Sequence, residues 1–105
     1  MSHYDTNLDK NKANYVPLTP LTFLKRAKEI YPKYEALIYE DRKYSWEEVY
    51  KRTVRFASAL KKIGIGKGDT VSFLAFNTPE IFEGHYSVPM TGTVLNTINI
   101  RLDAK

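Results

Sequence analysis

The stretch Thr70–Asn99, TVSFLAFNTPEIFEGHYSVPMTGTVLNTIN, predicts a strand, a helix and a second strand. The first strand is expected at Val71–Phe76, because a short and nearly continuous apolar run of β-forming residues is typical of a strand buried on both faces. The second strand is expected at Thr93–Ile98. Two strands joined by one helix form a parallel, right-handed βαβ unit, so we expect an α/β fold built around this unit.

The helix between these strands has its own start and stop signals. Residues 77–80, NTPE, begin it: the asparagine or threonine can cap, the proline suits the first helical position, and the glutamate lies near the positive end of the helix dipole. Pro89 lacks an amide hydrogen and crowds the preceding turn, so the helix is expected to kink or stop there. Gly92 then provides the exit into the second strand.

Residues 1–18 are predicted to be an extended N-terminal tail, and residues 19–105 a partial α/β domain. The tail is polar at first, and Pro17 and Pro20 bias the residues before them to extended backbone. Thr19 can cap an amphipathic helix that has Pro20 at its first position, and Pro32 ends that helix.

A small hairpin and a second amphipathic helix follow. Ala36–Tyr39 is expected to pair with a return strand that begins at Lys43. Ser45 and Glu48 have the spacing of a capping box, and Gly64 ends the helix that this box begins. Two ion pairs four residues apart are expected on its outer side, Glu47–Lys51 and Glu48–Arg52. The apolar face of the helix is expected to consist of Trp46, Val49, Tyr50, Thr53, Phe56, Ala57, Leu60 and Ile63.

Length and composition limit the choice of protein class. The 105 residues allow one small domain at most, and the absence of cysteine excludes disulfides and thiolate metal sites and fits a cytoplasmic protein. No stretch is long and apolar enough for a transmembrane segment, and the N-terminus lacks an apolar signal core. The net charge of +4 is a mild basic excess.

Three features suggest chemistry but have structural explanations. The segment Gly64–Thr70, GIGKGDT, resembles a phosphate-binding loop, yet it follows a helix and opens a strand, which is the reverse of what a phosphate loop requires. His85 and His3 have no second imidazole or paired carboxylate at metal-ligand spacing, so His85 is expected to be a packed or half-exposed helix residue. Ser45 is interpreted as a helix cap and not as a nucleophile.

Two groups of polar residues remain as candidates for binding. Five basic residues on the outer side of the second helix are able to contact nucleic acid, although a solvated face explains them better and no nucleic-acid partner is predicted; they are Lys51, Arg52, Arg55, Lys61 and Lys62. Asn77 and Thr78 lie where a parallel strand ends and a helix begins, which is where α/β sheets bind ligands. Asn96, Asn99 and Arg101 are able to line the same edge, although capping and loop polarity account for all five residues.

The order of these features resembles the N-terminal segment of the AMP-forming acyl-CoA synthetases, the adenylate-forming family that includes fatty-acyl-CoA ligases. The matching segments are PLTPLTFLKRAKEIYP (17–32), ALIYEDRKYSWEEVYKRTVRFASALKKIGIGKGDTVSFLAFNTPE (36–80) and VPMTGTVLNTINIRLDA (88–104). The similarity leans toward the medium- and long-chain fatty-acyl branch more than toward acetyl-CoA synthetases.

This resemblance implies a two-step ligase that uses ATP, Mg²⁺ and CoA to convert a carboxylic (fatty) acid into acyl-CoA, AMP and pyrophosphate. The family's phosphate loop, ribose- and magnesium-binding acids and catalytic lysine all lie beyond the matched segments, so the resemblance assigns no catalytic, cofactor-binding or metal residue here. The chain is expected to be scaffold, inactive alone, and its partners to be the remainder of the ligase or a homodimer partner. In some members the extreme N-terminus takes part in a homodimer contact, which would involve Met1–Pro20.

The sequence also predicts an incomplete sheet. Val71–Phe76 needs cover on both faces, and the helices available are few, so we expect a truncated fragment with an apolar patch on one sheet face or edge. The alternative is a stand-alone small α/β domain with a binding or regulatory role and no enzymatic activity.

Overall fold

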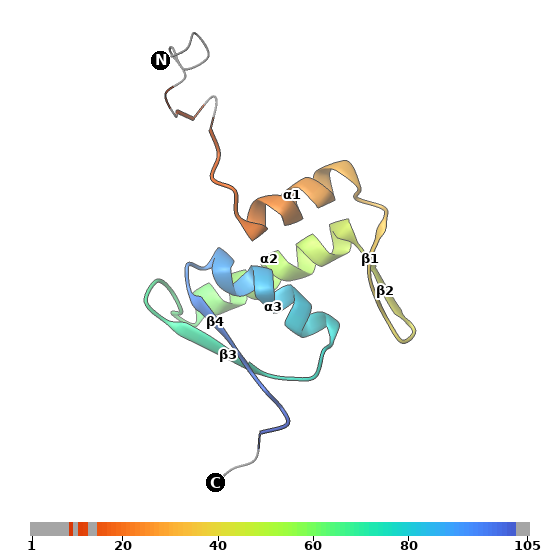
Figure 1. The fold of residues 1–105 in the computed structure, drawn as a ribbon, viewed down its shortest axis with the longest axis vertical. Coiled ribbons are helices and arrows are strands. Elements are labelled where there is room, and N and C mark those ends of the chain that lie inside the picture. Colours follow the sequence, from red (N-terminus) through yellow and green to blue (C-terminus); the bar gives the residue numbers. More distant parts are fainter. Residues whose placement is uncertain (1–8, 10, 13–14, 103–105) are drawn as a thin grey trace, which may run out of the picture.

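The computed structural model describes residues 9, 11–12 and 15–102 (Figure 1). Within these residues, three helices and four short strands follow one another, which is the mixed α/β fold expected from the sequence. In chain order the elements are α1 (Pro20–Ile30), β1 (Glu35–Tyr39), β2 (Arg42–Ser45), α2 (Trp46–Lys62), β3 (Thr70–Leu74), α3 (Pro79–Met90) and β4 (Val94–Ile98).

The predicted βαβ unit is present. Strands β3 and β4 are parallel, with Thr70 opposite Val94 and Leu74 opposite Ile98, and α3 connects them. Strand β3 ends at Leu74, two residues earlier than predicted. Helix α3 includes Pro89 and ends one residue later, at Met90, which agrees with the expected stop because proline cannot donate a helical hydrogen bond.

The expectation that the first strand is covered on both faces is wrong for the described chain. Exposure alternates along β3: Val71 and Phe73 are half-buried, while Leu74 is 71% exposed and Phe76, just beyond the strand, is 70% exposed. The reason is that the helices are grouped on one side of the β3–β4 pair (Figure 1). The predicted apolar patch on the sheet is therefore present.

Helix α1 begins as predicted, with Thr19 as its N-cap and Pro20 in its first turn. The Thr19 side chain accepts a hydrogen bond from the Thr22 amide, and the Thr22 hydroxyl in turn accepts one from the Thr19 amide. The predicted tail, residues 1–18, lies mostly outside the described residues. The part that is described ends in two strongly exposed apolar side chains, Val16 and Leu18.

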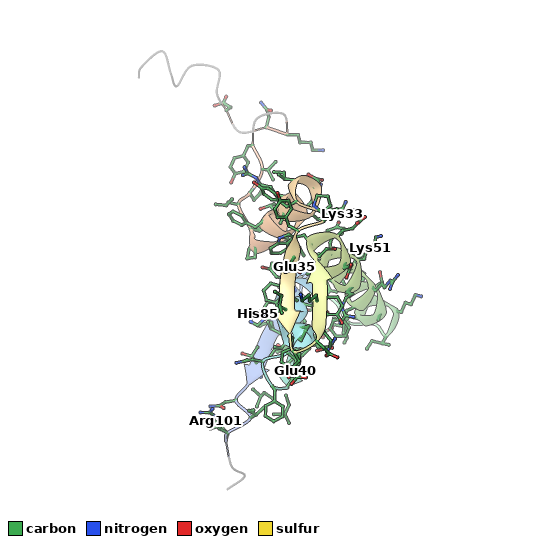
Figure 2. The ribbon with its side chains drawn as sticks, turned by 90° about the vertical axis from the view of Figure 1, so that its right-hand side faces the viewer. Lys33, Glu35, Glu40, Lys51, His85 and Arg101 are labelled. Carbon is green, nitrogen blue, oxygen red and sulfur yellow. The ribbon has the colours of Figure 1, made fainter. Side chains whose placement is uncertain are left out.

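The hairpin of β1 and β2 is antiparallel and turns at Glu40, which has a φ of 54°. It extends away from the helices on the side of the molecule opposite the turn between α2 and β3 (Figure 1). Lys33 lies at its base and Glu40 at its tip (Figure 2).

Helix α2 begins at the predicted cap, where the Ser45 hydroxyl accepts a hydrogen bond from the Glu48 amide. Its apolar face packs on the other two helices, but the prediction that Ile63 belongs to this face is wrong. Ile63 follows the last helical residue and is 73% exposed. Among the described residues, the buried apolar core consists of Leu24, Val49, Ala57, Leu60 and Val88.

Candidate functional site

The carboxyl ends of β3 and β4 enclose a hollow of about 590 Å³ next to the first turn of α3. Of the five polar residues predicted for this edge, the structure brings together Asn77, Asn99 and Arg101. The lining residues are Ala75, Phe76, Asn77, Ile81, Thr97, Ile98, Asn99, Ile100 and Arg101. The hollow therefore has mainly apolar walls with one guanidinium and two amide groups at its rim.

The other two predicted residues lie elsewhere. The Asn96 amide donates a hydrogen bond to the Ser72 hydroxyl on the neighbouring strand, at 3.1 Å, and so belongs to the sheet. Thr78 is the N-cap of α3, although its side chain makes no capping hydrogen bond.

The groups that line the hollow are suited to binding a ligand. The Asn99 side-chain oxygen accepts a hydrogen bond from the Arg101 amide at 2.9 Å, which shapes the rim. An exposed arginine beside apolar walls is able to hold a group with an apolar body and a negative end. Among the described residues that line the hollow, none carries an imidazole or a carboxylate.

An ionic cluster that the sequence analysis missed connects β2, α2 and α3. Arg52 donates two hydrogen bonds to the Glu83 carboxylate, at 2.5 and 3.2 Å, and a third contact reaches Glu80 at 3.7 Å. Arg42 donates to Glu80 at 2.7 Å. The predicted Glu48–Arg52 pair is therefore replaced, because Arg52 turns from the solvent toward a carboxylate that is buried on the neighbouring helix.

The charges in this cluster reinforce one another. The hydrogen bond from Arg42 lowers the pKa of Glu80 to about 2, and the bond to Glu83 raises the pKa of Arg52. Both guanidinium groups lie over the Tyr44 ring, that of Arg42 at 5.3 Å and that of Arg52 at 4.5 Å from its centroid. No local spacing in the sequence marks this cluster, because Arg52 and the buried Glu83 are 31 residues apart.

A second, apolar groove of about 460 Å³ lies between the hairpin and α3, where Figure 2 shows His85 beside the strands. The His85 ring nitrogen Nδ1 donates to the Ile81 carbonyl oxygen at 2.7 Å, so His85 is an exposed helix residue held by its own backbone. His85 therefore lies on a helix as expected, but it is exposed and not packed. His3 lies outside the described residues.

The glycine-rich segment is a turn, as its context predicted. It leaves α2 and opens β3, and the Gly66 amide donates a hydrogen bond to the Asp69 carboxylate at 2.9 Å. Gly64 and Gly68 have φ values of 90° and 97°, which favour glycine. The amides of Gly64, Ile65, Gly66 and Asp69 all donate hydrogen bonds within this turn or to the end of α2.

The predicted basic surface of α2 is only partly as expected. Lys51 pairs with Glu47 at 3.7 Å, as predicted, and Arg52 joins the ionic cluster. Arg55, Lys61 and Lys62 are exposed.

Within the described residues, no three histidine, aspartate or glutamate side chains gather as metal ligands do. Over the same residues, none of the helices has the length and apolar character needed to cross a bilayer.

A sequence profile described as "AMP-binding enzyme" matches residues 24–105. The chain belongs to the AMP-binding enzyme family. Its relatives include the peroxisomal butyrate–CoA ligase AAE11 of Arabidopsis thaliana, 52% identical over 99 residues, and the peroxisomal trans-cinnamate:CoA ligase of Petunia hybrida, 54% identical over 96 residues. These alignments cover 94% and 91% of this chain but only 17% of each relative.

Solved structures of the family have the same fold. The o-succinylbenzoate CoA synthetase MenE of Bacillus subtilis, in complex with ATP and magnesium, superposes with a TM-score of 0.73 at 27% identity, over 77% of this chain and 22% of that one. The N-terminal subdomain of NpsA from Klebsiella oxytoca gives a TM-score of 0.75 at 21% identity, over 80% of this chain and 22% of that one. The fold is that of the N-terminal part of adenylate-forming enzymes.

Proposed function

We propose that this AMP-binding family chain is a scaffold segment of an ATP-dependent acyl-CoA ligase and has no ligase activity alone. The observation that carries the proposal is the uncovered apolar side of the βαβ unit, where Leu74 and Phe76 are more than two-thirds exposed. A sheet face of this kind is stabilised when further chain packs on it. The relatives, of which this chain matches 17%, have that further chain.

The cofactors that the family resemblance implies also support a scaffold role for this segment. Binding of ATP and Mg²⁺ requires a cradle of backbone amides for phosphates and carboxylates for the metal. In the described part of this chain the glycine-rich turn precedes a strand, and the carboxylates of α3 are held by arginines. These residues do not fit a nucleotide or magnesium site, so no catalytic step is assigned to them.

The substrate of the proposed ligase is a carboxylic acid. The sequence resemblance favours medium- and long-chain fatty acids, while the names of relatives specify butyrate, trans-cinnamate and benzoate. A substrate panel therefore includes aliphatic acids of several lengths and aromatic acids.

The cytoplasmic location expected from the sequence also remains a proposal. Several relatives are named as peroxisomal, so peroxisomes are the compartment to compare. Fluorescence of the tagged native product against a peroxisomal marker distinguishes the two locations.

Two measurements test the scaffold proposal. An antibody against residues 20–102 should detect, in extract of the source cells, a product several times heavier than this chain. The purified 105-residue chain should show no ATP-dependent formation of acyl-CoA with any acid of the panel. Turnover by the isolated chain would overturn the proposal, and a native product of this chain's own mass would favour the stand-alone binding domain.

A further inference from the structure

The turn between α2 and β3 carries a patch that the ligase proposal does not use. We define the cationic tip as Lys61, Lys62, Ile63 and Lys67, all of them exposed. The side chain of Ile63 is the most exposed of the apolar residues expected on the buried face of α2, at 73%. The green loop at the left of Figure 1 carries the tip.

The charges of the tip are not neutralised locally. Among the described residues, no carboxylate lies within ion-pair distance of any of its three lysines, although other lysines of the chain have such partners. The nearest acid in sequence, Asp69, has its carboxylate engaged by the Gly66 amide. The tip therefore presents three free positive charges.

A second exposed apolar side chain lies beside the tip. The Val94 amide donates a hydrogen bond to the Asp69 carbonyl oxygen at 3.0 Å, which brings the start of β4 next to the turn. Val94 is 62% exposed. Aliphatic side chains thus project from the same end of the molecule as the three lysines.

The dipole of α2 explains only part of this arrangement of lysines and exposed aliphatic side chains. Lys61 and Lys62 lie in the last turn of α2, where cations are favourable because of the helix dipole. Lys67 lies outside any helix, and the dipole gives no reason for an exposed isoleucine between the lysines.

We propose that the cationic tip is a docking site for membranes rich in anionic phospholipids. Lysines near such a surface are attracted to its negative charge, and an aliphatic side chain among them is able to enter the interface. Single-stranded nucleic acid fits less well, because its non-specific sites combine cations with stacking aromatic rings and the tip has none. Duplex DNA would use the lysines but gives no role to the exposed Ile63.

The position of the tip is compatible with the rest of the fold. It lies at the amino-terminal end of the parallel strands, whereas the hollow around Asn77 and Arg101 lies at their carboxyl ends. A membrane bound at the tip would leave that hollow free. The proposal is independent of the ligase assignment, and the test below does not use enzymatic activity.

The test is co-sedimentation of the 105-residue chain with vesicles at low ionic strength. One set of vesicles contains phosphatidylcholine alone and the other contains phosphatidylserine as well. The variants are K61Q/K62Q/K67Q, I63S and the control K12Q/K25Q/R26Q, which removes the same charge from exposed residues elsewhere. Circular dichroism verifies that each variant has the same thermal midpoint as the parent chain.

We expect binding to the anionic vesicles only, weakened by added salt. Each lysine removed from the tip should weaken binding to the anionic vesicles about fivefold. The triple variant should therefore bind anionic vesicles no better than it binds neutral ones. I63S should weaken binding severalfold, and the control should stay within about twofold of the parent chain. Equal loss in the control and the tip variant would overturn the proposal. Equal binding of the parent chain to neutral and anionic vesicles would also overturn it. So would displacement of the chain from anionic vesicles by random-sequence DNA, if the I63S variant is displaced to the same extent.

Discussion

Gly84 of α3 lies directly against the Phe73 ring of β3. A β-carbon at this position would lie 2.8 Å from Cζ of Phe73, and the Phe73 ring is itself held edge-to-face against Phe56. Gly84→Ala should therefore lower the free energy of unfolding by about 1–2 kcal/mol, because the strain of overpacking exceeds the gain in helix propensity. Urea unfolding followed by circular dichroism measures the change.

Ser87→Ala is the matched control on the same buried face of α3. The Ser87 hydroxyl is fully buried and has no hydrogen-bond partner within the described chain, so its removal should be neutral or stabilising. Equal destabilisation by the two substitutions would show that the Gly84–Phe73 contact is not what limits the packing.

Glu83 depends on a single guanidinium. Its side chain is 8% exposed, whereas that of Arg52 is 32% exposed. Arg52→Met should lower the free energy of unfolding by about 2–3 kcal/mol, because it leaves a buried carboxylate without its counter-ion while part of the loss is relieved by solvent. Urea unfolding at neutral pH measures this.

Two further variants decide whether that loss is electrostatic. Arg55→Met removes an exposed arginine one turn away and should change stability by less than about 0.5 kcal/mol. The double variant R52M/E83M should recover most of the stability lost in R52M, since no buried charge remains. A double variant as unstable as the single one would mean that packing and not charge is responsible.

At the scale of elements, Arg42 and Glu80 join the hairpin to the first turn of α3. The pKa of Glu80 is about 2 in the fold, lowered from its ordinary value of 4.5 first by the hydrogen bond from Arg42 and then by hydrogen bonds from its own backbone and from Thr78. A carboxyl group whose pKa is lowered by folding stabilises the fold at pH values above its pKa in the unfolded state. This contribution is therefore complete above pH 4.5 and disappears as the pH falls toward 2.

Arg42→Leu should therefore reduce the loss of stability between pH 4.5 and 2, measured by urea unfolding at a series of pH values in low salt. The effect should be small, since half of the Glu80 side chain is exposed and solvent screens the pair. The pKa of Glu47 is lowered as well by its hydrogen bond from Lys33, but that contribution is common to both proteins and cancels. Identical pH profiles would show that the Arg42–Glu80 bond does not persist in solution.

The elements also show what the sequence was able to predict. Local signals were sufficient for Thr19 and Pro20 at the start of α1, for Ser45 at the start of α2, and for Gly92 at the exit of α3. These succeed because a cap or a left-handed turn depends on residues within one helical turn.

Features that depend on another element were missed. Glu48 and Arg52 have the spacing of an ion pair, but Glu83 lies 31 residues from Arg52 and offers a buried carboxylate with two oxygens. Ile63 fits the apolar period of α2, yet the helix ends before it and nothing covers it. The βαβ order was sufficient to predict the sheet edge at which the candidate hollow lies. The residues that line it were predicted only in part, because Asn96 bonds across the strands to Ser72 instead.

At the scale of the whole molecule, a small core supports a large uncovered surface. The buried apolar residues of the described chain lie among the three helices, while the β3–β4 pair contributes mostly half-buried and exposed side chains. Small domains bury a low fraction of their surface, and burial of an open apolar sheet face between two molecules favours their association.

We therefore expect the isolated chain to self-associate through this face. L74Q/F76Q should lower the association constant at least about tenfold, because each fully buried apolar side chain contributes about 1.5–3 kcal/mol. Light scattering after size-exclusion chromatography, over a range of concentrations, measures the change. V16Q/L18Q is the matched control, since it removes two equally exposed apolar side chains, 70% and 81%, outside the sheet. If both double variants reduce association equally, exposed apolar area in general drives it; if only the control does, the surface before α1 is the contact and the sheet face is not.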